Sequence, residues 1–378
     1  MAISRRTLLS AFGTTAVAAA MPQTLRAFSR ITNAGDSPET GSRVIRLDKN
    51  ENPYGPADNV AAALRSGLQI ANRFPEIELE ALTKRIADVH GVQPEQVIIG
   101  CGSTEILSMC SRAFLTPQSK LLMSTPGFEP IADYARAAGA YVQMVPLAKN
   151  YSNDLASIAQ QSSAAGLVYI SNPHNPTGTI NPRQNIEAFI RALPAHTYIL
   201  IDEAYHHYVT PSSSYASFID HPMNDPRVIV TRTFSKIYGL AGMRIGYGIA
   251  AAQTVKRIGV YRLHEEVNVS AARAARIAFE ANDHVQTCAQ RNTDNRQEFC
   301  NQANARMLRW IDSQTNFVLL NAGRNGLEVS EHFRRNNILL ASGFPSMENY
   351  VRVTVGSPEE MKEFWRVWDL MPQHAMAM

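Results

Sequence analysis

The stretch Thr231-Arg-Thr-Phe-Ser-Lys-Ile-Tyr-Gly-Leu240 places a lysine, Lys236, shortly after the apolar run Val228-Ile-Val230. Several glycines and Arg244 follow it closely. A lysine amine at a strand end, beside hydroxyls and an arginine, can form a Schiff base with an aldehyde cofactor whose phosphate these neighbours hold. Most lysines are solvated surface residues. The interpretation therefore depends on the motifs that accompany this segment elsewhere in the chain.

The composition is that of an ordinary soluble globular protein. The chain has 378 residues, enough for about two or three domains, with 45% hydrophobic and 18% charged residues. Its net charge of +3 is too small to favour a nucleic-acid partner. The four cysteines form no C-x-x-C pair and show no metal-ligand spacing with histidines. We therefore predict mostly buried free thiols, no metal site and no nucleic-acid partner.

Residues 1–27 differ from the rest of the chain. The stretch Ser4-Arg-Arg-Thr-Leu-Leu9 precedes an acid-free run of small and apolar residues from Ser10 to Met21, and Leu25-Arg-Ala27 offers a small-residue cleavage point. This pattern resembles a twin-arginine signal, which sends folded proteins through the twin-arginine export machinery to the periplasm. The apolar run is shorter than the roughly 20 residues of a spanning helix, so no stable membrane anchor is expected.

Short apolar runs then alternate with amphipathic stretches. We expect strands at residues 97–99, 121–124, 141–145, 167–171, 197–201, 228–231 and 246–250. Helices separate most of them, at residues 104–114, 129–138, 154–161 and 183–192. Such alternation predicts an α/β fold with a mainly parallel seven-stranded sheet flanked by helices, and with ligands held at the carboxyl ends of the strands.

The pattern changes after about residue 252. A long helical region leads to alternating short strands and helices, which predicts a smaller α/β domain packed against the sheet. The resulting segments are a signal peptide at 1–27, a linker at 28–42, an N-terminal arm at 43–70, a large domain at 71–252 and a small C-terminal domain at 253–378.

A glycine-rich turn joins an expected strand to an expected helix at Ile99-Gly-Cys-Gly-Ser-Thr-Glu105. Gly102 leaves the backbone free to bend, and Ser103 or Thr104 can cap the helix while its unpaired amides point at an anion. The turn is therefore a candidate phosphate site, although most turns of this kind bind nothing.

Two further motifs place polar groups directly after expected strands. The stretch Ser171-Asn-Pro-His-Asn-Pro-Thr-Gly178 is a rigid corner that can fix a side-chain amide as a donor to a ligand oxygen. The stretch Ile201-Asp-Glu-Ala-Tyr205 places Asp202 after an apolar run. A buried carboxylate is costly unless it is paired, and a protonated ring nitrogen would be a suitable partner.

Eight motifs now stand in order between roughly residues 44 and 370. They are Leu-Asp-Lys-Asn-Glu-Asn-Pro-Tyr-Gly, Asn-Arg-Phe-Pro-Glu, Gly-Ser-Thr-Glu, Asn-Pro-His-Asn-Pro-Thr-Gly, Asp-Glu-Ala-Tyr, Thr-Phe-Ser-Lys, Gly-Met-Arg-Ile-Gly and Val-Arg-Val-Thr-Val-Gly. Together they resemble the class I/II, fold-type I aminotransferases that depend on pyridoxal 5'-phosphate, and within them the histidinol-phosphate aminotransferase group. The resemblance implies a fold-type I structure, this cofactor, amino acid and 2-oxo acid substrates, and a homodimer.

The resemblance also implies a role for each candidate residue. Lys236 would form the Schiff base and later shuttle a proton, while Asp202 would pair with the pyridine nitrogen. Asn175 and Tyr205 would donate hydrogen bonds to the phenolic oxygen of the cofactor. The other implied contacts are Phe128 on the cofactor ring; Gly102, Ser103, Thr104, Thr233 and Arg244 around the phosphate; and Asn52, Tyr54, Asn175 and Arg352 around the substrate, whose carboxylate Arg352 would clamp.

Some positions depart from the family pattern. Many relatives have a tyrosine where this chain has Phe74, so one contact to the phosphate of the neighbouring subunit is missing or replaced. Histidinol-phosphate enzymes tend to carry an arginine where this chain has Ala341, which argues against a phosphorylated substrate, as does export. Glu265 and Glu266 stand near the region that reads the substrate side chain; they either favour a cationic amino acid or are solvated surface glutamates.

Three hypotheses for the function remain. The leading one is an exported, dimeric aminotransferase. A decarboxylase or carbon-sulfur lyase with the same cofactor would use the same lysine, aspartate and phosphate-binding residues, because the outcome depends on which bond lies perpendicular to the ring. A non-catalytic binding protein of this fold would usually lack Lys236 or Asp202, and both are present.

Overall fold

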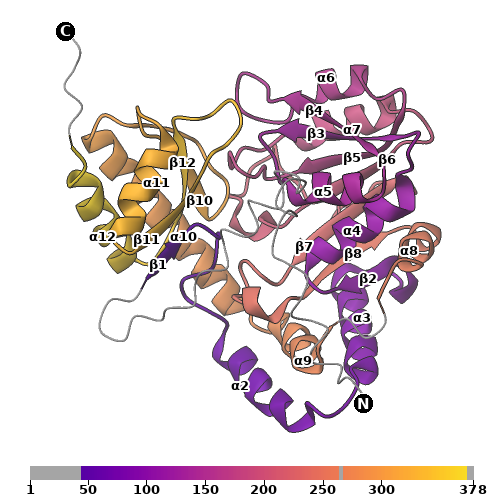
Figure 1. Cartoon of the computed structure of the whole chain (residues 1–378). Helices are drawn as coiled ribbons and strands as arrows, with labels where there is room; N and C mark the ends of the chain where they lie inside the picture. Colours follow the sequence, from indigo (N-terminus) through magenta and orange to yellow (C-terminus); the bar gives the residue numbers. More distant parts are fainter. Residues whose placement is uncertain (1–43, 264–266, 373–378) are drawn as a thin grey trace, which may run out of the picture. The chain divides into compact units, whose positions relative to one another are not determined.

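The structure, a computed structural model, describes residues 44–263 and 267–372. The predicted signal peptide and linker lie outside the described residues, as do Glu265 and Glu266. From Val44 onward the chain forms one compact unit that contains two β-sheets (Figure 1).

The larger sheet has seven strands in the order β2-β8-β7-β6-β5-β3-β4. They span Val97–Gly100 (β2), Lys120–Thr125 (β3), Tyr141–Pro146 (β4), Ala165–Ser171 (β5), Tyr198–Asp202 (β6), Val228–Thr233 (β7) and Gly246–Ala250 (β8). Neighbours from β7 to β4 are parallel, whereas β8 is antiparallel to both β2 and β7. The predicted mainly parallel seven-stranded sheet is therefore confirmed.

Helices cover both faces of this sheet because its strands are apolar on both sides. They are α3 (Glu76–His90), α4 (Ser103–Phe114), α5 (Pro130–Ala137), α6 (Leu155–Gln160), α7 (Arg183–Ala192), α8 (Ala252–Gly259) and α9 (Val269–Ala278). Helix α2 (Asp58–Gly67) packs against α9. On β6, Ile199 and Ile201 pack in one core with α3, α7 and α9, whereas Leu200 packs in the other with α4, α5 and α8. This alternation places successive side chains of one strand on opposite faces.

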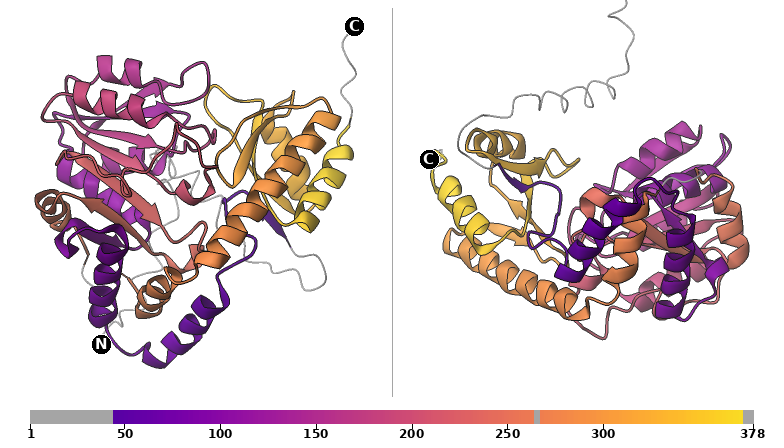
Figure 2. Two further views of the ribbon diagram at one scale, coloured as in Figure 1. Left: turned by 180° about the vertical axis from the view of Figure 1, so that it is seen from behind. Right: turned by 90° about the horizontal axis from the view of Figure 1, so that it is seen from below.

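The smaller sheet has five strands in the order β1-β11-β12-β10-β9. They span Ile45–Leu47 (β1), Arg309–Ile311 (β9), Phe317–Asn321 (β10), Ile338–Ser342 (β11) and Tyr350–Thr354 (β12), accompanied by helices α10 (Asn282–Ala305), α11 (Gly326–Arg335) and α12 (Pro358–Asp369). Figure 2 shows the long helix α10 running from the side of α9 toward this sheet. Strands β1, β9 and β11 were not predicted; β1 and β9 have only three residues each, and runs this short give a weak periodic signal. β1 pairs in parallel with β11, so the N-terminal arm contributes a strand to the C-terminal sheet.

The expectations drawn from composition can now be compared with the structure. All four cysteines are free; Cys110 and Cys288 are buried, and Cys101 and Cys300 are half-buried. Within the described ranges, no helix is long and apolar enough to cross a membrane. The same part of the chain contains no group of three or more His, Cys, Asp and Glu side chains that could hold a metal ion.

Candidate active site

A cavity of about 910 Å³ lies at the carboxyl ends of β5, β6 and β7, where residues of β11, β12 and the N-terminal arm complete its wall. Ligands of open α/β sheets bind at this end of the strands. The cavity lining includes the predicted site residues Ser103, Thr104, Phe128, Asn175, Asp202, Tyr205, Thr233, Lys236, Arg244 and Arg352. The structure therefore brings most of the predicted residues together around one cavity.

Lys236 follows strand β7 and reaches the N-terminal arm. Its Nζ donates hydrogen bonds to the backbone oxygens of Lys49 and Asn50, each at 2.9 Å. Burial lowers the pKa of the amine to about 7, and the positive charge of Arg352 acts in the same direction. A large fraction of the amine is therefore neutral and nucleophilic near neutral pH.

Asp202 ends strand β6 and is only 6% exposed. Its Oδ2 accepts a 3.0 Å hydrogen bond from the Tyr169 hydroxyl, and its Oδ1 accepts one of 3.1 Å from the Ala204 amide. Burial raises the pKa of the carboxyl to about 6, although these hydrogen bonds and the charge of Lys236 act in the opposite direction. A buried carboxylate of this kind is suited to a cationic group on a ligand.

The phenol of Tyr205 lies against the cavity between two amides. Its oxygen accepts a 2.9 Å hydrogen bond from Asn50 Nδ2 and a longer one, 3.5 Å, from Asn175 Nδ2. The Phe317 ring packs edge-on against the tyrosine ring, with 5.1 Å between centroids. The position of the hydroxyl is therefore fixed from several sides.

The start of helix α4 and the side chain of Arg244 form an anion-binding end of the cavity. Gly102 precedes the helix with a φ of 75°, and a Cβ on it would collide with Nη2 of Arg244. A Cβ on Gly246 would collide with the backbone nitrogen of Ser103, the first residue of the helix. Unpaired amides at a helix start and a guanidinium are groups that bind phosphate. This end of the cavity is therefore suited to a phosphate group.

Arg352, on strand β12, provides a further cationic group of the cavity. Its Nη1 donates a 2.7 Å hydrogen bond to Asn175 Oδ1, and its Nη2 donates one of 2.8 Å to the backbone oxygen of Asp48. Its Nε is buried and has no hydrogen-bond partner in the described structure. Burial lowers the pKa of the guanidinium, so a carboxylate ligand would be a favourable partner.

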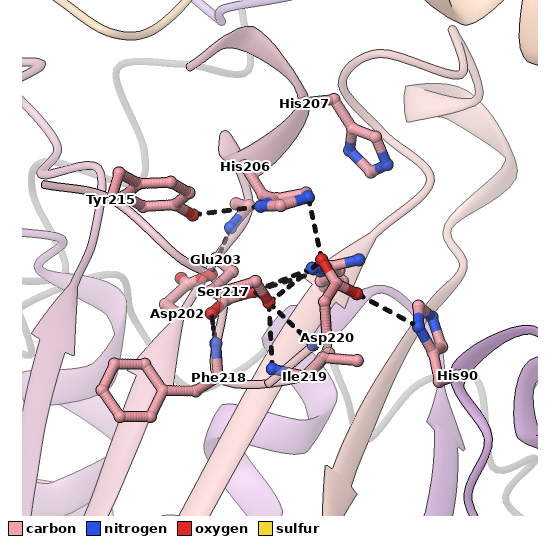
Figure 3. A network of polar contacts seen from close by, with 12 residues as sticks. His90, Asp202, Glu203, His206, His207, Tyr215, Ser217, Phe218, Ile219 and Asp220 are labelled. Atoms are coloured by element: carbon pink, nitrogen blue, oxygen red, sulfur yellow. Dashed lines mark hydrogen bonds and ion pairs between the residues drawn. The ribbon is translucent and has the colours of Figure 1, made fainter. Parts of the chain in front are cut away.

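A buried ionic network lies beside Asp202 and uses the next residue of the chain, Glu203 (Figure 3). Glu203 Oε2 accepts hydrogen bonds from Arg232 Nε at 3.1 Å and from Ser217 Oγ at 2.6 Å. Arg232 also contacts Asp220 at 3.0 Å. Arg232 belongs to β7, the strand that leads to Lys236. The network therefore joins Glu203, the residue after Asp202, to that strand.

Two residues predicted to bind substrate, Asn52 and Tyr54, do not line this cavity. Asn52 Nδ2 donates a 2.8 Å hydrogen bond to the backbone oxygen of Ile237, and the Tyr54 hydroxyl accepts one of 2.9 Å from Asn295. Their side chains therefore attach the N-terminal arm to the residue after Lys236 and to helix α10. Their predicted contact with substrate stays a prediction.

Tyr169 and Asn50 are among the residues of the cavity lining that the sequence analysis did not predict. Tyr169 stands two positions before Ser171 on β5, and Ser171 pairs with Asp202 in the sheet. The period-two alternation of the strand could have placed Tyr169 on the face of Asp202. Asn50 lies within a quoted motif, yet it meets Tyr205 across a separation of 155 positions, which no local pattern reveals.

Comparisons with known proteins define the class of this enzyme. The profile of the family "Aminotransferase class I and II" matches residues 42–367. The chain belongs to this family, and the predicted enzyme class, fold and cofactor, pyridoxal 5'-phosphate, are confirmed.

The individual relatives point to one group within the family. The chain is 34% identical over 324 residues to a histidinol-phosphate aminotransferase of Brevibacillus brevis, covering 84% of this chain and 88% of the relative. It is 31% identical over 320 residues to the enzyme of that name from Geobacillus thermodenitrificans, covering 84% and 87%.

Solved structures agree with this assignment. A histidinol-phosphate aminotransferase from Sinorhizobium meliloti in complex with pyridoxal-5'-phosphate has a TM-score of 0.82 and 25% identity, covering 98% of this chain and 97% of that one. An L-threonine-O-3-phosphate decarboxylase from Porphyromonas gingivalis, with a TM-score of 0.75 and 21% identity over 86% of this chain and 98% of that one, shares the fold. The fold alone therefore does not decide the reaction.

The residues of the cavity fit the cofactor of the family. Asp202 offers a buried carboxylate to a protonated ring nitrogen; burial raises the pKa of this carboxyl to about 6, so a cationic partner would stabilise its ionised form. Gly102 lies so close to Arg244 that any side chain at position 102 would occupy the space in which a phosphate could bind. Lys236 supplies an amine whose lowered pKa suits attack on an aldehyde.

Proposed function

We propose that the chain transfers an amino group between an amino acid and a 2-oxo acid. One observation carries the proposal: a single cavity holds Lys236, Asp202 and Arg352. These residues supply an amine for the cofactor aldehyde, an acid for the cofactor ring and a guanidinium for a substrate carboxylate. When bound, the cofactor supplies a ring that draws off electrons from the substrate α-carbon and carries the amino group between the two substrates.

The side chains of the cavity have separate tasks in this proposal. Lys236 holds the cofactor and then moves the proton at the substrate α-carbon. Asp202 keeps the ring nitrogen protonated, and Tyr205 donates a hydrogen bond to the phenolic oxygen. Phe128 stacks on the ring, and Arg352 orients the substrate carboxylate through two parallel hydrogen bonds. The phosphate is held by Ser103, Thr104, Thr233 and Arg244.

The direct test incubates the purified, cofactor-loaded protein with a panel of amino acids plus 2-oxoglutarate or pyruvate. We expect a new amino acid to form, and borohydride to attach the cofactor covalently to Lys236. Lys236→Ala should abolish turnover, whereas Lys256→Ala, an exposed lysine on α8, should retain it. Release of carbon dioxide, thiol or ammonia without a new amino acid would instead assign the decarboxylase or lyase chemistry.

The substrate is proposed to carry no phosphate. Ala341 lines the cavity and pairs directly with Arg352 across β11 and β12. An arginine at this position, as in the resemblance described above, would place a second guanidinium beside the first, whereas alanine leaves none. Arg46, another cation of the lining, is bonded to Asp48 at 3.1 Å. We expect unphosphorylated amino acids to exceed L-histidinol phosphate in kcat/KM, and Ala341→Arg to improve the phosphorylated donor; a better wild-type rate with that donor would refute this choice.

Export to the periplasm through the twin-arginine machinery is proposed from the sequence of residues 1–27. The Ser4-Arg-Arg-Thr-Leu-Leu9 stretch and the apolar run after it support this location. Fractionation of cells that express the full chain should recover mature protein in the periplasm. The double variant Arg5→Lys, Arg6→Lys should hold it in the cytoplasm, and an equal periplasmic yield would contradict the proposal.

A homodimer is also proposed. Large apolar side chains are exposed on and near α2 and α3: Leu68 is 71% exposed, Phe74 71% and Ile77 82%. Exposed apolar groups that lie together are typical of protein interfaces. Light scattering should give twice the chain mass, and Phe74→Asp combined with Ile77→Asp should shift the protein toward monomer. If the protein is a monomer, light scattering will give the mass of one chain both before and after these two substitutions.

A further inference from the structure

We propose that Asn50 and Thr354 form a directed hydrogen-bond chain that points the proton of the Tyr205 hydroxyl into the cavity. Asn50 is then a positioning residue for the reaction, acting through Tyr205. The inference rests on the proposed function, in which the Tyr205 hydroxyl donates to the phenolic oxygen of the cofactor.

Every polar atom of Asn50 is engaged, although the residue is only 2% exposed. Its backbone nitrogen donates to Thr354 Oγ1 at 2.9 Å, and its backbone oxygen accepts hydrogen bonds from Lys236 at 2.9 Å and from Asn316 at 3.0 Å. Its φ of 54° is in the left-handed region, which asparagine tolerates better than most residues. The residue therefore joins the N-terminal arm, the smaller sheet and the site.

The Asn50 amide turns its oxygen toward Thr354. Thr354 Oγ1 already accepts from the backbone nitrogen of Asn50, so its single proton is free to be donated to Asn50 Oδ1, 3.3 Å away. With its oxygen turned to Thr354, the amide presents Nδ2 to the Tyr205 hydroxyl at 2.9 Å. The tyrosine oxygen is therefore an acceptor in this contact.

A second amide has the same effect on Tyr205. Arg352 Nη1 donates to Asn175 Oδ1 at 2.7 Å, which turns Asn175 Nδ2 toward the Tyr205 hydroxyl at 3.5 Å. Neither amide nitrogen can accept a proton from the phenol. Since both neighbours are donors, the phenol proton is left to point into the cavity that Tyr205 lines.

The orientation has a measurable consequence that does not depend on turnover. A hydrogen bond donated to an ionised phenolic oxygen stabilises the charged form and lowers the pKa of the group that titrates with it. The cofactor-bound protein should therefore change its absorption spectrum at a lower pH when the Tyr205 proton points inward. Reversing the hydroxyl should raise that pH by about 1 to 2 units, the shift expected for loss of one hydrogen bond to a charged group.

Asn50→Asp is the decisive variant. Aspartate keeps the shape and tolerates the left-handed backbone, but its carboxylate accepts the Tyr205 proton instead of donating to the phenol. We expect its spectral midpoint to rise by about 1 to 2 pH units, to the value of Tyr205→Phe. Thr354→Val, which removes the donor that orients Asn50, should raise the midpoint in the same direction, and Thr354→Ser should restore it.

The double variant Asn50→Asp, Tyr205→Phe separates orientation from a general disturbance. If Asn50 acts through Tyr205, the double variant has the midpoint of Tyr205→Phe alone. A further rise equal to that of Asn50→Asp in the wild-type protein would overturn the inference, as would unchanged midpoints in both Asn50→Asp and Thr354→Val. If Asn50→Asp does not retain the cofactor, the spectral midpoints of Thr354→Val and Thr354→Ser test the inference instead. A wild-type protein that binds the cofactor but does not transaminate would refute the proposed function while leaving this test intact.

Discussion

The hydroxyl of Tyr169 donates a 3.0 Å hydrogen bond to Oδ2 of Asp202, and both residues are buried. They stand on the neighbouring parallel strands β5 and β6. The bond lowers the pKa of the Asp202 carboxyl, whereas burial raises it more strongly, to about 6. Tyr169 therefore helps to keep ionised the acid that is proposed to pair with the cofactor ring.

Tyr169→Phe should make the cofactor bind less well in mildly acidic solution. Loss of one hydrogen bond to a charged group raises the carboxyl pKa by about 1 unit, so the fall in cofactor affinity on the acid side should begin at a pH about 1 unit higher. Fluorescence titration of the cofactor-free protein from pH 5 to 8 would measure this. Tyr141→Phe, at a side chain that is 65% exposed on β4, is the matched control. Identical pH profiles for the two variants would contradict the role of Tyr169.

Asp202→Asn should stabilise the cofactor-free protein above pH 6 while abolishing transamination. The native carboxyl has a pKa of about 6, against an ordinary value of 3.8, so the native state holds its proton more tightly than the unfolded state. Stability conferred by the protonated acid is therefore present below pH 4 and is lost as the pH rises to about 6, by about 3 kcal/mol.

Asparagine does not titrate, but its amide can accept only one of the two hydrogen bonds that the carboxylate accepts. We therefore expect a net gain in the free energy of unfolding of about 1 to 2 kcal/mol at pH 7.5. Urea denaturation at pH 4 and pH 7.5 would reveal it. A variant that is less stable than wild type by the same amount at both pH values would show that ionisation of Asp202 is not the cause.

Gly102→Ala should weaken phosphate binding. Its φ of 75° disfavours a side chain, and the new Cβ would collide with the Arg244 guanidinium. Displacing one charge-assisted contact should weaken cofactor affinity by about 10-fold or more, from a loss of about 1.5 to 3 kcal/mol. Gly259→Ala is the control, because Gly259 lies on α8 outside the cavity lining and nothing lies within 4 Å of a Cβ there. Equal cofactor dissociation constants for the two variants would remove Arg244 from the phosphate site.

Removing one partner of the buried pair between Glu203 and Arg232 should destabilise the protein severely. Both side chains are almost fully buried, and they meet at 3.1 Å. Glu203→Gln leaves Arg232 with less compensation, at an expected cost of about 3 kcal/mol in the free energy of unfolding.

The double variant Glu203→Gln, Arg232→Met tests whether the loss comes from the unpaired charge. It should recover part of the stability, because no isolated buried charge remains. The free energies of unfolding of the wild type, the two single variants and the double variant, measured with a denaturant, form a double-mutant cycle. Additive losses in the double variant would mean that the two side chains act independently.

The sequence by itself determined the fold class and the chemistry of the site. The seven strands of the larger sheet are short apolar runs, and such runs are visible because burial on both faces demands them locally. Lys236, Asp202 and Arg352 could be identified because each stands in a motif whose order along the chain is diagnostic. Local pattern was sufficient for the strands, and the order of the motifs for the predicted site residues.

Only the tertiary structure decided how the site is supported. The pairing of β1 with β11, the contact of Tyr169 with Asp202 and the placement of Asn52 outside the cavity lining all depend on long-range packing. Asn50 meets Tyr205 across 155 positions and Thr354 across 304. The periodicity of neighbouring residues specifies a helix or a strand, but it carries no information about which distant side chain completes a hydrogen bond. That is set when the two sheets and the N-terminal arm pack together.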